Sequence, residues 1–351
     1  MCVTAACVAR LLRSRDTGVS LSGYGRDSRT DLGRPPRARL ASRRCGSFSR
    51  INPMARFDRT GMLALRQEAL PACIAALFSV TAFATSAGRG PADLPAQPEN
   101  VRIVTNCDDA GGGSLRDAVT NAVSGDVIDL SGLACGKITL TNGKLSATMG
   151  DLMLLGSGVG PDATHPLTIY GYYDQIIDHG TGTLVISGLR LIGGSAYGKG
   201  GCVSSQGSLV IESSIISGCG AYSPAGANVV AAGGAVFAAQ DLWIHKSAIT
   251  DSFAYAGTEV SYGGGVFASG IVTIEDSTIA GNKAIAPTAY AVGGGVAVVG
   301  VDDVLIMSST ISGNEATFGG GLHIDTLGTT EVVDGTLSGN YAAAYGGAGS
   351  F

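Results

Sequence analysis

The chain has 351 residues, of which 54 are Gly, 6% are aromatic and 15% are charged. So little charge excludes a disordered polyelectrolyte or a coiled coil, and the lack of a Gly triplet period excludes collagen. The net charge of -5 is unevenly distributed along the chain. Residues 1–69 hold 14 Arg and 5 acidic residues, whereas the remainder holds 9 basic and 23 acidic residues. The acidic remainder disfavours nucleic acid and polyanionic glycans as partners.

The amino-terminal segment predicts export. Basic residues, an apolar run and small residues follow Met54 in the order of a signal peptide. We interpret residues 1–53 as a non-native or disordered leader, 54–87 as a signal peptide starting at Met54 or Met62, and 88–100 as a linker. An organelle transit peptide is the alternative for the Arg-rich leader. Export predicts an extracellular or outer-membrane-surface location.

Four Cys follow the predicted signal peptide. In an oxidising compartment they would have the opportunity to form two disulfides. Chain order favours pairing Cys107 with Cys135 and Cys202 with Cys219, and the alternative is that all four are small buried apolar residues. No Cys-x-x-Cys pair is present to indicate a zinc or redox site.

A short helix is predicted near the start of the folded part. Ser114 has the character of an N-cap, and Asp117 stands three residues later, where it can reach back to the cap. The apolar residues Leu115 and Val119, with Ala118 between them, give this helix a face that can cover the open end of a solenoid.

The rest of the chain is a repeat. Each copy opens with two glycines, at intervals of 26 to 33 residues. The third residues of these openings are Cys202, Ala235, Gly265, Gly295, Gly321 and Ala348. A second phrase of the type Ser-Thr-Ile-Ser-Gly-Asn follows each opening, clearest at 277–282, 309–314 and 335–340.

Apolar residues recur at every second position within each copy, which indicates strands and excludes helix. Strands are also predicted upstream at 138–140, 152–155 and 167–170. Three short strands per repeat predict an all-β fold, a right-handed parallel β-helix of the pectin-lyase-like type, covering residues 101–351. Because the last double glycine lies just before Phe351, we expect the domain to be truncated at its carboxyl end.

Equivalent positions of the repeats are predicted to stack along the axis. Two inward apolar ladders are expected, Ile186, Ile211, Ile244, Ile274, Ile306 and Val332, and Leu191, Ile216, Ile249, Ile279, Ile311 and Leu337. We also expect an inward hydroxyl ladder of Ser214, Ser247, Ser277 and Ser309 and a hydrogen-bonded ladder of Asn282, Asn314 and Asn340.

Two motifs resemble a known group of proteins. Gly113-Ser114-Leu115-Arg116-Asp117-Ala118 is similar to the Cys-Ser-Leu-Arg-Glu-Ala segment of bacterial secreted β-helix proteins, with Gly and Asp in place of Cys and Glu. The Gly-Gly-x-Val and Ile-x-x-Asn phrases resemble the repeats of the polymorphic outer membrane protein family, although Ile or Leu replaces the family's Phe. The resemblance implies a β-helix that serves as an adhesin, an autotransporter passenger or a polysaccharide-cleaving enzyme.

We assign no catalytic, cofactor-binding or metal-ligating residue from the sequence. The nearest group to a site is His245 and Lys246 beside Glu275 and Asp276 one repeat later, which we interpret as a cross-strand ion-pair ladder. Other polar features are interpreted as ordinary turns, loop acids or isolated histidines. They are the turn Gly198-Lys199-Gly200, the acidic pairs Asp108-Asp109 and Asp302-Asp303, and the histidines His165, His179 and His323. For the two acidic pairs, weak calcium binding is the alternative.

The sequence therefore predicts an exported structural or adhesive β-helix without catalysis. The expected partners are glycans or surface proteins, and membrane association would come only through a missing carboxyl-terminal part. The alternative is a polysaccharide lyase or glycoside hydrolase of the same fold, which would need at least two converging ionisable groups.

Overall fold

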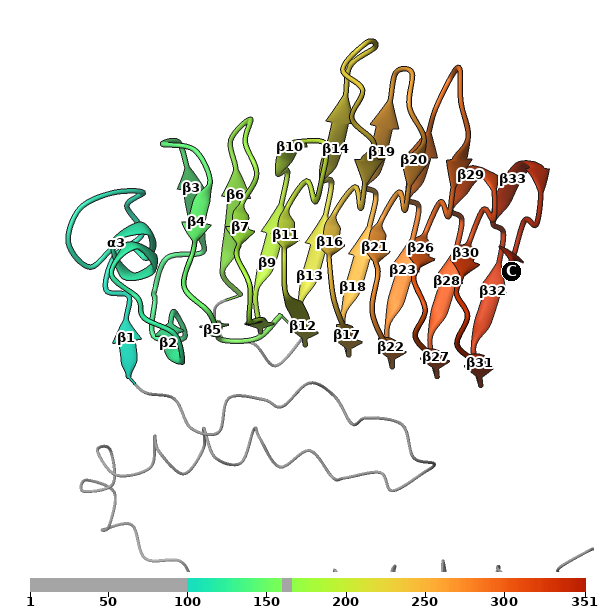
Figure 1. The fold of residues 1–351 in the computed structure, drawn as a ribbon. Helices are drawn as coiled ribbons and strands as arrows, with labels where there is room; N and C mark the ends of the chain where they lie inside the picture. The colour runs from blue at the N-terminus through green and yellow to red at the C-terminus, as the bar shows by residue number, and fades with distance from the viewer. Residues whose placement is uncertain (1–99, 160–165) are drawn as a thin grey trace, which may run out of the picture. The chain divides into compact units, whose positions relative to one another are not determined.

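The computed structural model describes residues 100–159 and 166–351. The predicted leader, the predicted signal peptide and residues 88–99 of the predicted linker lie outside the described residues. The described chain forms a parallel β-helix of about eight turns, with α3 (Leu115–Thr120) as its only helix (Figure 1). Within this part of the chain, no helix has the length and apolar character needed to cross a membrane.

Three sheets form the wall of the solenoid, and every strand pairs in parallel with its counterpart in the next turn. The first is made of β1 (Val101–Ile103), β2 (Asp126–Asp129), β5 (Leu152–Leu155), β8 (Thr183–Ser187), β12 (Ser208–Glu212), β17 (Leu242–His245), β22 (Val272–Glu275), β27 (Val304–Met307) and β31 (Thr330–Val333). The second is made of β3 (Lys137–Leu140), β6 (Thr168–Gly171), β9 (Arg190–Ile192), β13 (Ile215–Ser217), β18 (Ala248–Thr250), β23 (Thr278–Ala280), β28 (Thr310–Ser312) and β32 (Thr336–Ser338). The third is made of β4 (Leu145–Ala147), β7 (Ile177–His179), β11 (Val203–Ser205), β16 (Val236–Ala238), β21 (Val266–Ala268), β26 (Val296–Val299), β30 (Leu322–Asp325) and β34 (Gly349–Ser350).

Alternating side chains decide which face of each strand is buried. In β22, Val272 and Ile274 are 0% exposed, whereas Thr273 and Glu275 point outward and stay partly accessible. Ile274 pairs with Ile244 in the preceding turn and with Ile306 in the next. The strand registers confirm the stacking of both predicted apolar ladders, whose members are buried except in the last turn, where Val332 is exposed and Leu337 is partly buried.

A fourth sheet lies outside this wall and was not predicted. The unequal loops project beyond the solenoid and pair with one another, as the upper part of Figure 1 shows. Its outgoing strands are β10 (Ser195–Tyr197), β14 (Gly220–Ser223), β19 (Phe253–Ala256), β24 (Lys283–Ile285), β29 (Glu315–Phe318) and β33 (Tyr341–Tyr345), and its returning strands are β15 (Ala231–Ala232), β20 (Ser261–Tyr262) and β25 (Ala291–Val292). Buried alanines such as Ala221, Ala231 and Ala254 fill the space between outgoing and returning strands, and their small size lets these strands pack closely.

The amino-terminal cap forms largely as predicted. The Ser114 hydroxyl oxygen accepts a hydrogen bond from the Asp117 N–H, and Leu115 and Val119 are buried against the first turns. The Asp117 carboxylate reaches one residue further back than expected, because it accepts from the N–H of Gly113 rather than that of Ser114. Cys107 and Cys135 are joined by a disulfide, as chain order predicted.

The double glycines meet two different steric demands at one corner. The first glycine is left-handed, as in Gly263 with a φ of 59°. The second has an ordinary φ but no space, because a Cβ on Gly264 would lie 2.3 Å from the carbonyl oxygen of Gly294 in the next turn. Both positions are therefore restricted to glycine, for separate reasons.

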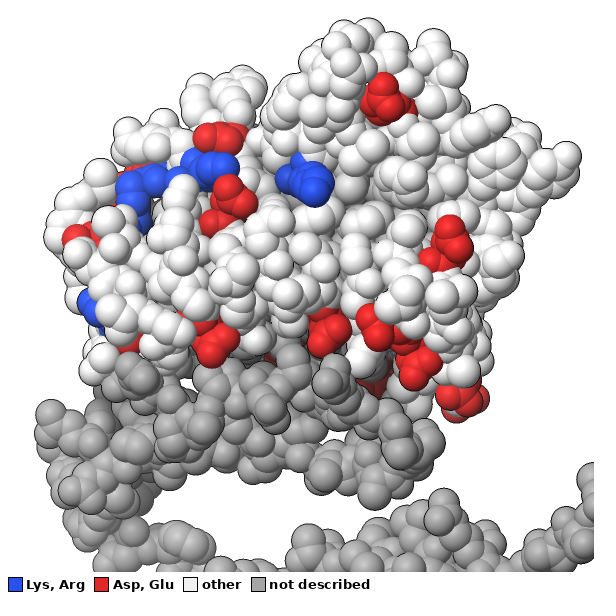
Figure 2. Space-filling view, viewed as in Figure 1, with Lys and Arg blue, Asp and Glu red and all other residues white. Residues whose placement is uncertain are grey.

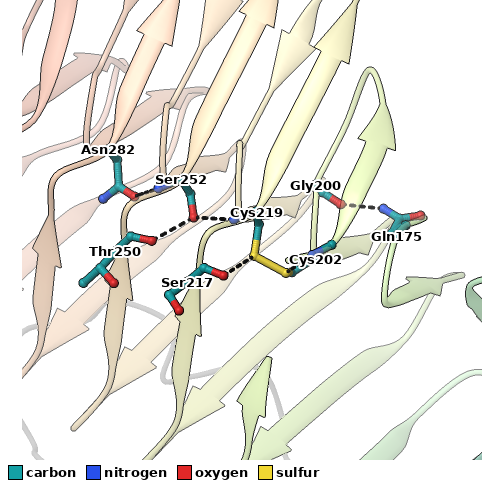
Figure 3. The surroundings of a disulfide bond; sticks show 9 residues. Gln175, Gly200, Cys202, Ser217, Cys219, Thr250, Ser252 and Asn282 are labelled. Carbon is teal, nitrogen blue, oxygen red and sulfur yellow. Dashed lines mark hydrogen bonds between the residues drawn. A yellow bond between two sulfur atoms is a disulfide. The ribbon is translucent and has the colours of Figure 1, made fainter. Parts of the chain in front are cut away.

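Each turn closes at a point that we call the neck. The neck is where the third residue of the glycine phrase meets the last residue of the second phrase, before the chain enters the fourth sheet. In the Cys202 turn the two positions are joined by the predicted Cys202–Cys219 disulfide (Figure 3). In later turns the same positions are Ala235 with Ser252 and Gly265 with Asn282.

Polar side chains at the neck form the predicted axial ladder. Asn282 accepts from the N–H of Ser252 at 3.0 Å, and its amide donates to the carbonyl of Ile249 at 3.0 Å. Asn314 accepts from the N–H of Asn282 at 2.9 Å, and Asn340 repeats the contact with Asn314 at 3.0 Å. Each asparagine therefore satisfies buried backbone groups of the preceding turn.

The predicted serine ladder runs along another corner. The N–H groups of Ser214, Ser247 and Ser277 each donate to the hydroxyl oxygen of the serine in the following turn, at 3.0 to 3.1 Å. Each hydroxyl donates in turn to a carbonyl two residues earlier in its own chain, as Ser277 does to Glu275 at 2.6 Å. These contacts hold a left-handed residue between them, for example Asp276 with a φ of 49°.

The sizes of the two neck residues compensate each other. A Cβ placed on Gly265 would lie 2.9 Å from Cγ of Asn282, which is closer than real Cβ contacts come. Where the partner is the shorter Ser252, the chain carries Ala235 instead of glycine. The same Cβ would also lie 2.9 Å from the carbonyl oxygen of Gly295, so Asn282 is one of two groups that favour glycine at position 265, and a serine in its place would remove that one.

This compensation is testable with a double-mutant cycle. We expect Gly265→Ala to lower the free energy of unfolding by about 1–3 kcal/mol, because it overpacks the neck. Adding Asn282→Ser recreates the Ala235/Ser252 pairing and should recover at least about 1 kcal/mol relative to the sum of the single changes. Denaturant unfolding measures each value.

The matched control pairs Gly265→Ala with Asn340→Ser, which lies two turns away. That combination should be additive. Equal coupling in both pairs would contradict the size compensation at the neck.

Candidate functional site

The group of ionisable residues richest in potential ligands lies on the outer face of the first sheet. Glu212, His245 and Glu275 are the last residues of β12, β17 and β22, and the registers place them side by side in successive turns. Asp276 follows at the bend, in a left-handed conformation with a φ of 49°. We call these four residues the His245 cluster.

The imidazole of His245 lies between carboxylates of two neighbouring turns. Its Nδ1 is 2.7 Å from Oε2 of Glu212, and its Nε2 is 3.8 Å from Oδ2 of Asp276. The side chain of His245 is 19% exposed and that of Asp276 is 48% exposed, so the cluster is open to solvent. Ligand atoms of His245, Glu275 and Asp276 all lie within 4.8 Å of one another.

The predicted ion-pair ladder is only partly correct. His245 approaches Asp276 as expected, but its close partner is Glu212 in the preceding turn, which the sequence analysis did not consider. Lys246 forms no ion pair with any residue in 100–159 or 166–351. The sequence offset between repeats would have been sufficient to predict that Glu212 lies beside His245 in the preceding turn.

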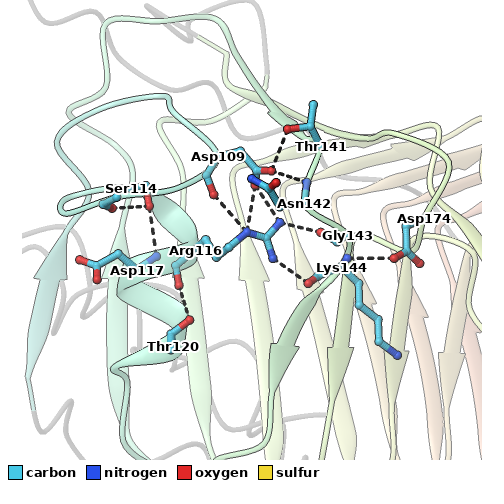
Figure 4. A network of polar contacts seen from close by, with 11 residues as sticks. Asp109, Ser114, Arg116, Asp117, Thr120, Thr141, Asn142, Gly143, Lys144 and Asp174 are labelled. Atoms are coloured by element: carbon cyan, nitrogen blue, oxygen red, sulfur yellow. Dashed lines mark hydrogen bonds and ion pairs between the residues drawn. The ribbon is translucent and has the colours of Figure 1, made fainter.

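Arg116, from the segment that resembles bacterial β-helix proteins, has a structural role (Figure 4). Its guanidinium donates to Oδ1 of Asp109 at 2.7 Å and to the carbonyls of Gly143 and Lys144 at 2.6 and 2.8 Å. The other carboxylate oxygen of Asp109 accepts from the N–H of Asn142 at 2.6 Å. Arg116 and Asp109 thus tie the cap to the first turns, and both oxygens of Asp109 are engaged.

The electrostatics of Asp109 follow from these contacts. Burial raises the pKa of this carboxyl, but the hydrogen bonds from Arg116 and Asn142 together with the charge of Arg116 outweigh it, so the pKa lies below its ordinary value. Asp303 also has a lowered pKa, because its carboxylate accepts the N–H and hydroxyl of Thr329. Asp109 and Asp303 act in these contacts as loop-fixing acids.

His179 and His323 lie apart from the His245 cluster in the strand registers. His179 is buried, with Nδ1 2.8 Å from the Ser205 hydroxyl and Nε2 2.7 Å from the Gly150 carbonyl. Because a carbonyl only accepts, Nε2 carries the proton and Nδ1 accepts from Ser205. His323 contacts Ser350 at 2.8 Å, and His165 lies outside the described residues.

The segment Gly198-Lys199-Gly200 makes contacts within the fold. Lys199 places its ammonium 4.4 Å from the centre of the Phe237 ring, and Gly200 is left-handed with a φ of 56°. Phe237 in turn stacks on Phe267 of the next turn, with ring centres 5.3 Å apart. This lysine therefore packs on an aromatic column.

Aromatic side chains gather on the outer face of the fourth sheet. Tyr197, Tyr222 and Tyr255 occupy one row of successive turns, and the Tyr222 and Tyr255 rings stack with centres 5.2 Å apart. Phe253 stands two residues before Tyr255 on the same side of its strand. Tyr197, Tyr222 and Phe253 are 63%, 45% and 42% exposed. We call these four residues the tyrosine face.

Charge is sparse beside these features. On the side of the molecule seen in Figure 2, basic side chains gather over the first turns, acidic ones are scattered and most of the surface is uncharged. Near the tyrosine face, Lys283 and Glu315 neutralise each other with an ion pair of 2.9 Å. The contact surface on the projecting loops therefore carries little charge.

The chain matches no protein-family model, and a search of curated proteins returns no significant relative. The fold therefore defines the class of the protein, which is a parallel β-helix protein. The similarity to bacterial secreted proteins remains a prediction from the two sequence motifs.

The burial of His179 makes stability depend on pH. Desolvation lowers the pKa of His179 below 6.5, although the Gly150 carbonyl and nearby acids oppose the shift. The unfolded chain therefore binds a proton first as the pH falls, and the stabilising contribution, complete above pH 6.5, declines below it.

We expect the melting temperature to fall between about pH 7.5 and about pH 5, and to fall less in His179→Gln. Each unit of pKa depression is worth about 1.4 kcal/mol. Thermal unfolding followed by circular dichroism measures both proteins. An unchanged pH dependence in the variant would assign the effect to other groups.

Proposed function

We propose that the protein is an exported β-helix that acts as a structural and adhesive element at the cell surface and binds uncharged glycans through the tyrosine face. The carrying observation is the row of Tyr197, Tyr222 and Tyr255 on three successive paired strands, in which Tyr197 and Tyr222 are exposed and Tyr255 is partly exposed. Exposed, clustered aromatics are uncommon on a soluble surface unless they contact a partner.

The spacing of the row suits a linear ligand. Successive turns of a parallel β-helix are about 4.8 Å apart, so the row offers a tyrosine at each step along the axis, with the Tyr222 and Tyr255 rings stacked on each other. A sugar ring presents a face of C–H groups that packs on an aromatic ring such as that of Tyr197 or Phe253, while the tyrosine hydroxyls are available for hydrogen bonds to sugar hydroxyls. An extended oligosaccharide lying along the axis would meet several rings at once.

The charge pattern favours a neutral glycan over a polyanion. Lys283 lies on β24 of the same sheet, but its charge is compensated by Glu315. The chain past residue 90 has only three Arg and five Lys, and the contacts of Arg102 and Arg116 are with Asp126 and Asp109. A uronic-acid or sulfated polymer would therefore find little compensating charge.

The contacts also support a role without catalysis. Of the candidate charged groups, Asp109 and Asp303 are engaged in fixing loops, and the serine and asparagine ladders are engaged in backbone contacts. A lyase or hydrolase needs a base and an acid or a cation facing one substrate bond. The His245 cluster lacks an arginine or lysine within ion-pair distance in the described chain.

Binding to immobilised neutral oligosaccharides tests the adhesive proposal. We expect Tyr222→Ala and Tyr255→Ala each to weaken binding about tenfold or more, because each removes one ring of the stacked pair in the row. Tyr172→Ala is the matched control, since Tyr172 is 50% exposed but lies outside the fourth sheet. Equal losses in all three variants, or binding only to surface proteins, would overturn the glycan assignment.

A second assay separates adhesion from catalysis. We expect the purified protein to release neither reducing ends nor unsaturated products from pectin, polygalacturonate, alginate or chondroitin. Turnover that disappears in Lys246→Ala or Asp276→Ala would replace the adhesive proposal with an enzymatic one.

A further inference from the structure

We propose that His245, Glu275 and Asp276 form a binding site for a divalent transition metal, of the kind that zinc occupies, with Glu212 orienting the histidine. The site lies on the first sheet, and the inference is independent of the proposed glycan binding. It rests on the direction of the imidazole, the spacing of the ligand atoms and the local charge.

The orientation of the imidazole is the first observation. Nδ1 of His245 lies 2.7 Å from Oε2 of Glu212, a hydrogen bond in which the ring nitrogen donates to the carboxylate. This contact fixes the tautomer that leaves a lone pair on Nε2. Metal-bound histidines in proteins usually donate their other ring N–H to a carboxylate in this way, which raises the basicity of the ligating nitrogen.

The free nitrogen faces two further oxygen ligands. Nε2 of His245 is 3.8 Å from Oδ2 of Asp276, too long for a hydrogen bond. Zinc binds nitrogen and carboxylate oxygen at about 2.0–2.2 Å, so two of its tetrahedral ligands stand about 3.4 Å apart. The ligand atoms of His245, Glu275 and Asp276 lie within 4.8 Å of one another, and small side-chain rotations would bring them to this spacing.

The backbone fixes the positions of the three residues that would bind the metal. His245 and Glu275 are paired residues of adjacent strands, so their separation is set by the sheet. Asp276 is held at the bend in a left-handed conformation by the serine ladder, through the hydrogen bond from Ser277 to the Glu275 carbonyl. Three ligands thus come from two adjacent turns of a rigid wall, and remaining coordination positions would be open to water.

Local charge favours a cation at this point. Glu212, Glu275 and Asp276 are three carboxylates around one imidazole, and within the described ranges Lys246 joins none of them in an ion pair. A mixed imidazole and carboxylate set suits zinc, cobalt or manganese, whereas calcium and magnesium prefer oxygen ligands alone. The site is therefore expected to distinguish transition metals from calcium.

Metal binding at this site can be followed by the fluorescence of Trp243. Trp243 is the only tryptophan in the chain, and its ring lies 6.1 Å from that of His245. Titration of the full chain with cobalt chloride in chelator-free buffer should quench Trp243 emission saturably, because an open-shell ion bound at His245 sits close to the indole. Zinc chloride should reverse the quenching by displacement, and calcium chloride should not.

Conservative variants assign the ligands. We expect His245→Gln to abolish saturable quenching, Asp276→Asn to weaken it at least tenfold, and Glu212→Gln to weaken it about tenfold to a hundredfold. Asp251→Asn is the matched control, because Asp251 is also an exposed acid with a left-handed φ of 54° at another corner. Circular dichroism melting of each variant without metal verifies the fold.

A rise in melting temperature with zinc in the parent, absent in His245→Gln, is the second readout, since a ligand specific for the folded state stabilises it. Quenching that stays linear in cobalt concentration, or that is equal in the parent and His245→Gln, would overturn the site. So would saturable quenching that calcium reverses as well as zinc does.

Discussion

Hydrogen bonding between successive turns is the interaction on which the rest of the structure depends. Every wall strand pairs in parallel with its counterpart one turn away, and this fixes the distance between turns at about 4.8 Å. At that distance a residue touches its own equivalents above and below, so a side chain is acceptable only if copies of it can stack. The isoleucine ladder through Ile274 meets this condition in the core, and the serine ladder through Ser277 meets it at a corner.

The neck shows how the same constraint acts across a turn. Its two positions share one volume, and the chain fills it in three ways: with a disulfide at Cys202, with Ala235 opposite serine, and with glycine opposite asparagine from Gly265 onward. The asparagine version adds side-chain hydrogen bonds along the axis but forbids a Cβ on its partner. Along the chain, the neck is therefore closed first by a disulfide and later by side-chain hydrogen bonds.

Periodicity made the fold and its interior predictable. The inward positions of Ile244 and Ile274 follow from alternation within a repeat and from the offset between repeats, and both hold in the structure. The fourth sheet was missed because its returning strands at 231–232 and 261–262 are only two residues long, carry no apolar alternation and depend on pairing between loops of different turns. Tertiary contact, not local pattern, decides their conformation.

The surface was less predictable for a related reason. Strand periodicity predicted that His245 pairs with residues that follow it, whereas the imidazole turns toward Glu212 in the preceding turn. A row of outward residues extends in both directions, and the choice between neighbours depends on rotamers that strand periodicity does not encode. Tyr222 and Tyr255 were likewise not predicted to stack, because their row belongs to the fourth sheet.

The Cys202–Cys219 disulfide has a mechanical consequence. It joins the start of β11 to the end of β13, 17 residues later, and so makes one turn a covalently closed ring. Apart from the polypeptide backbone, the links between that turn and its neighbours are hydrogen bonds and packing, which can be lost one turn at a time when the ends are pulled. Under tension, the turns that carry Ala235, Gly265 and Gly295 can unwind in sequence, whereas this ring cannot lengthen while its disulfide is intact. The disulfide therefore removes the residues between Cys202 and Cys219 from the length that the solenoid can gain when it is stretched.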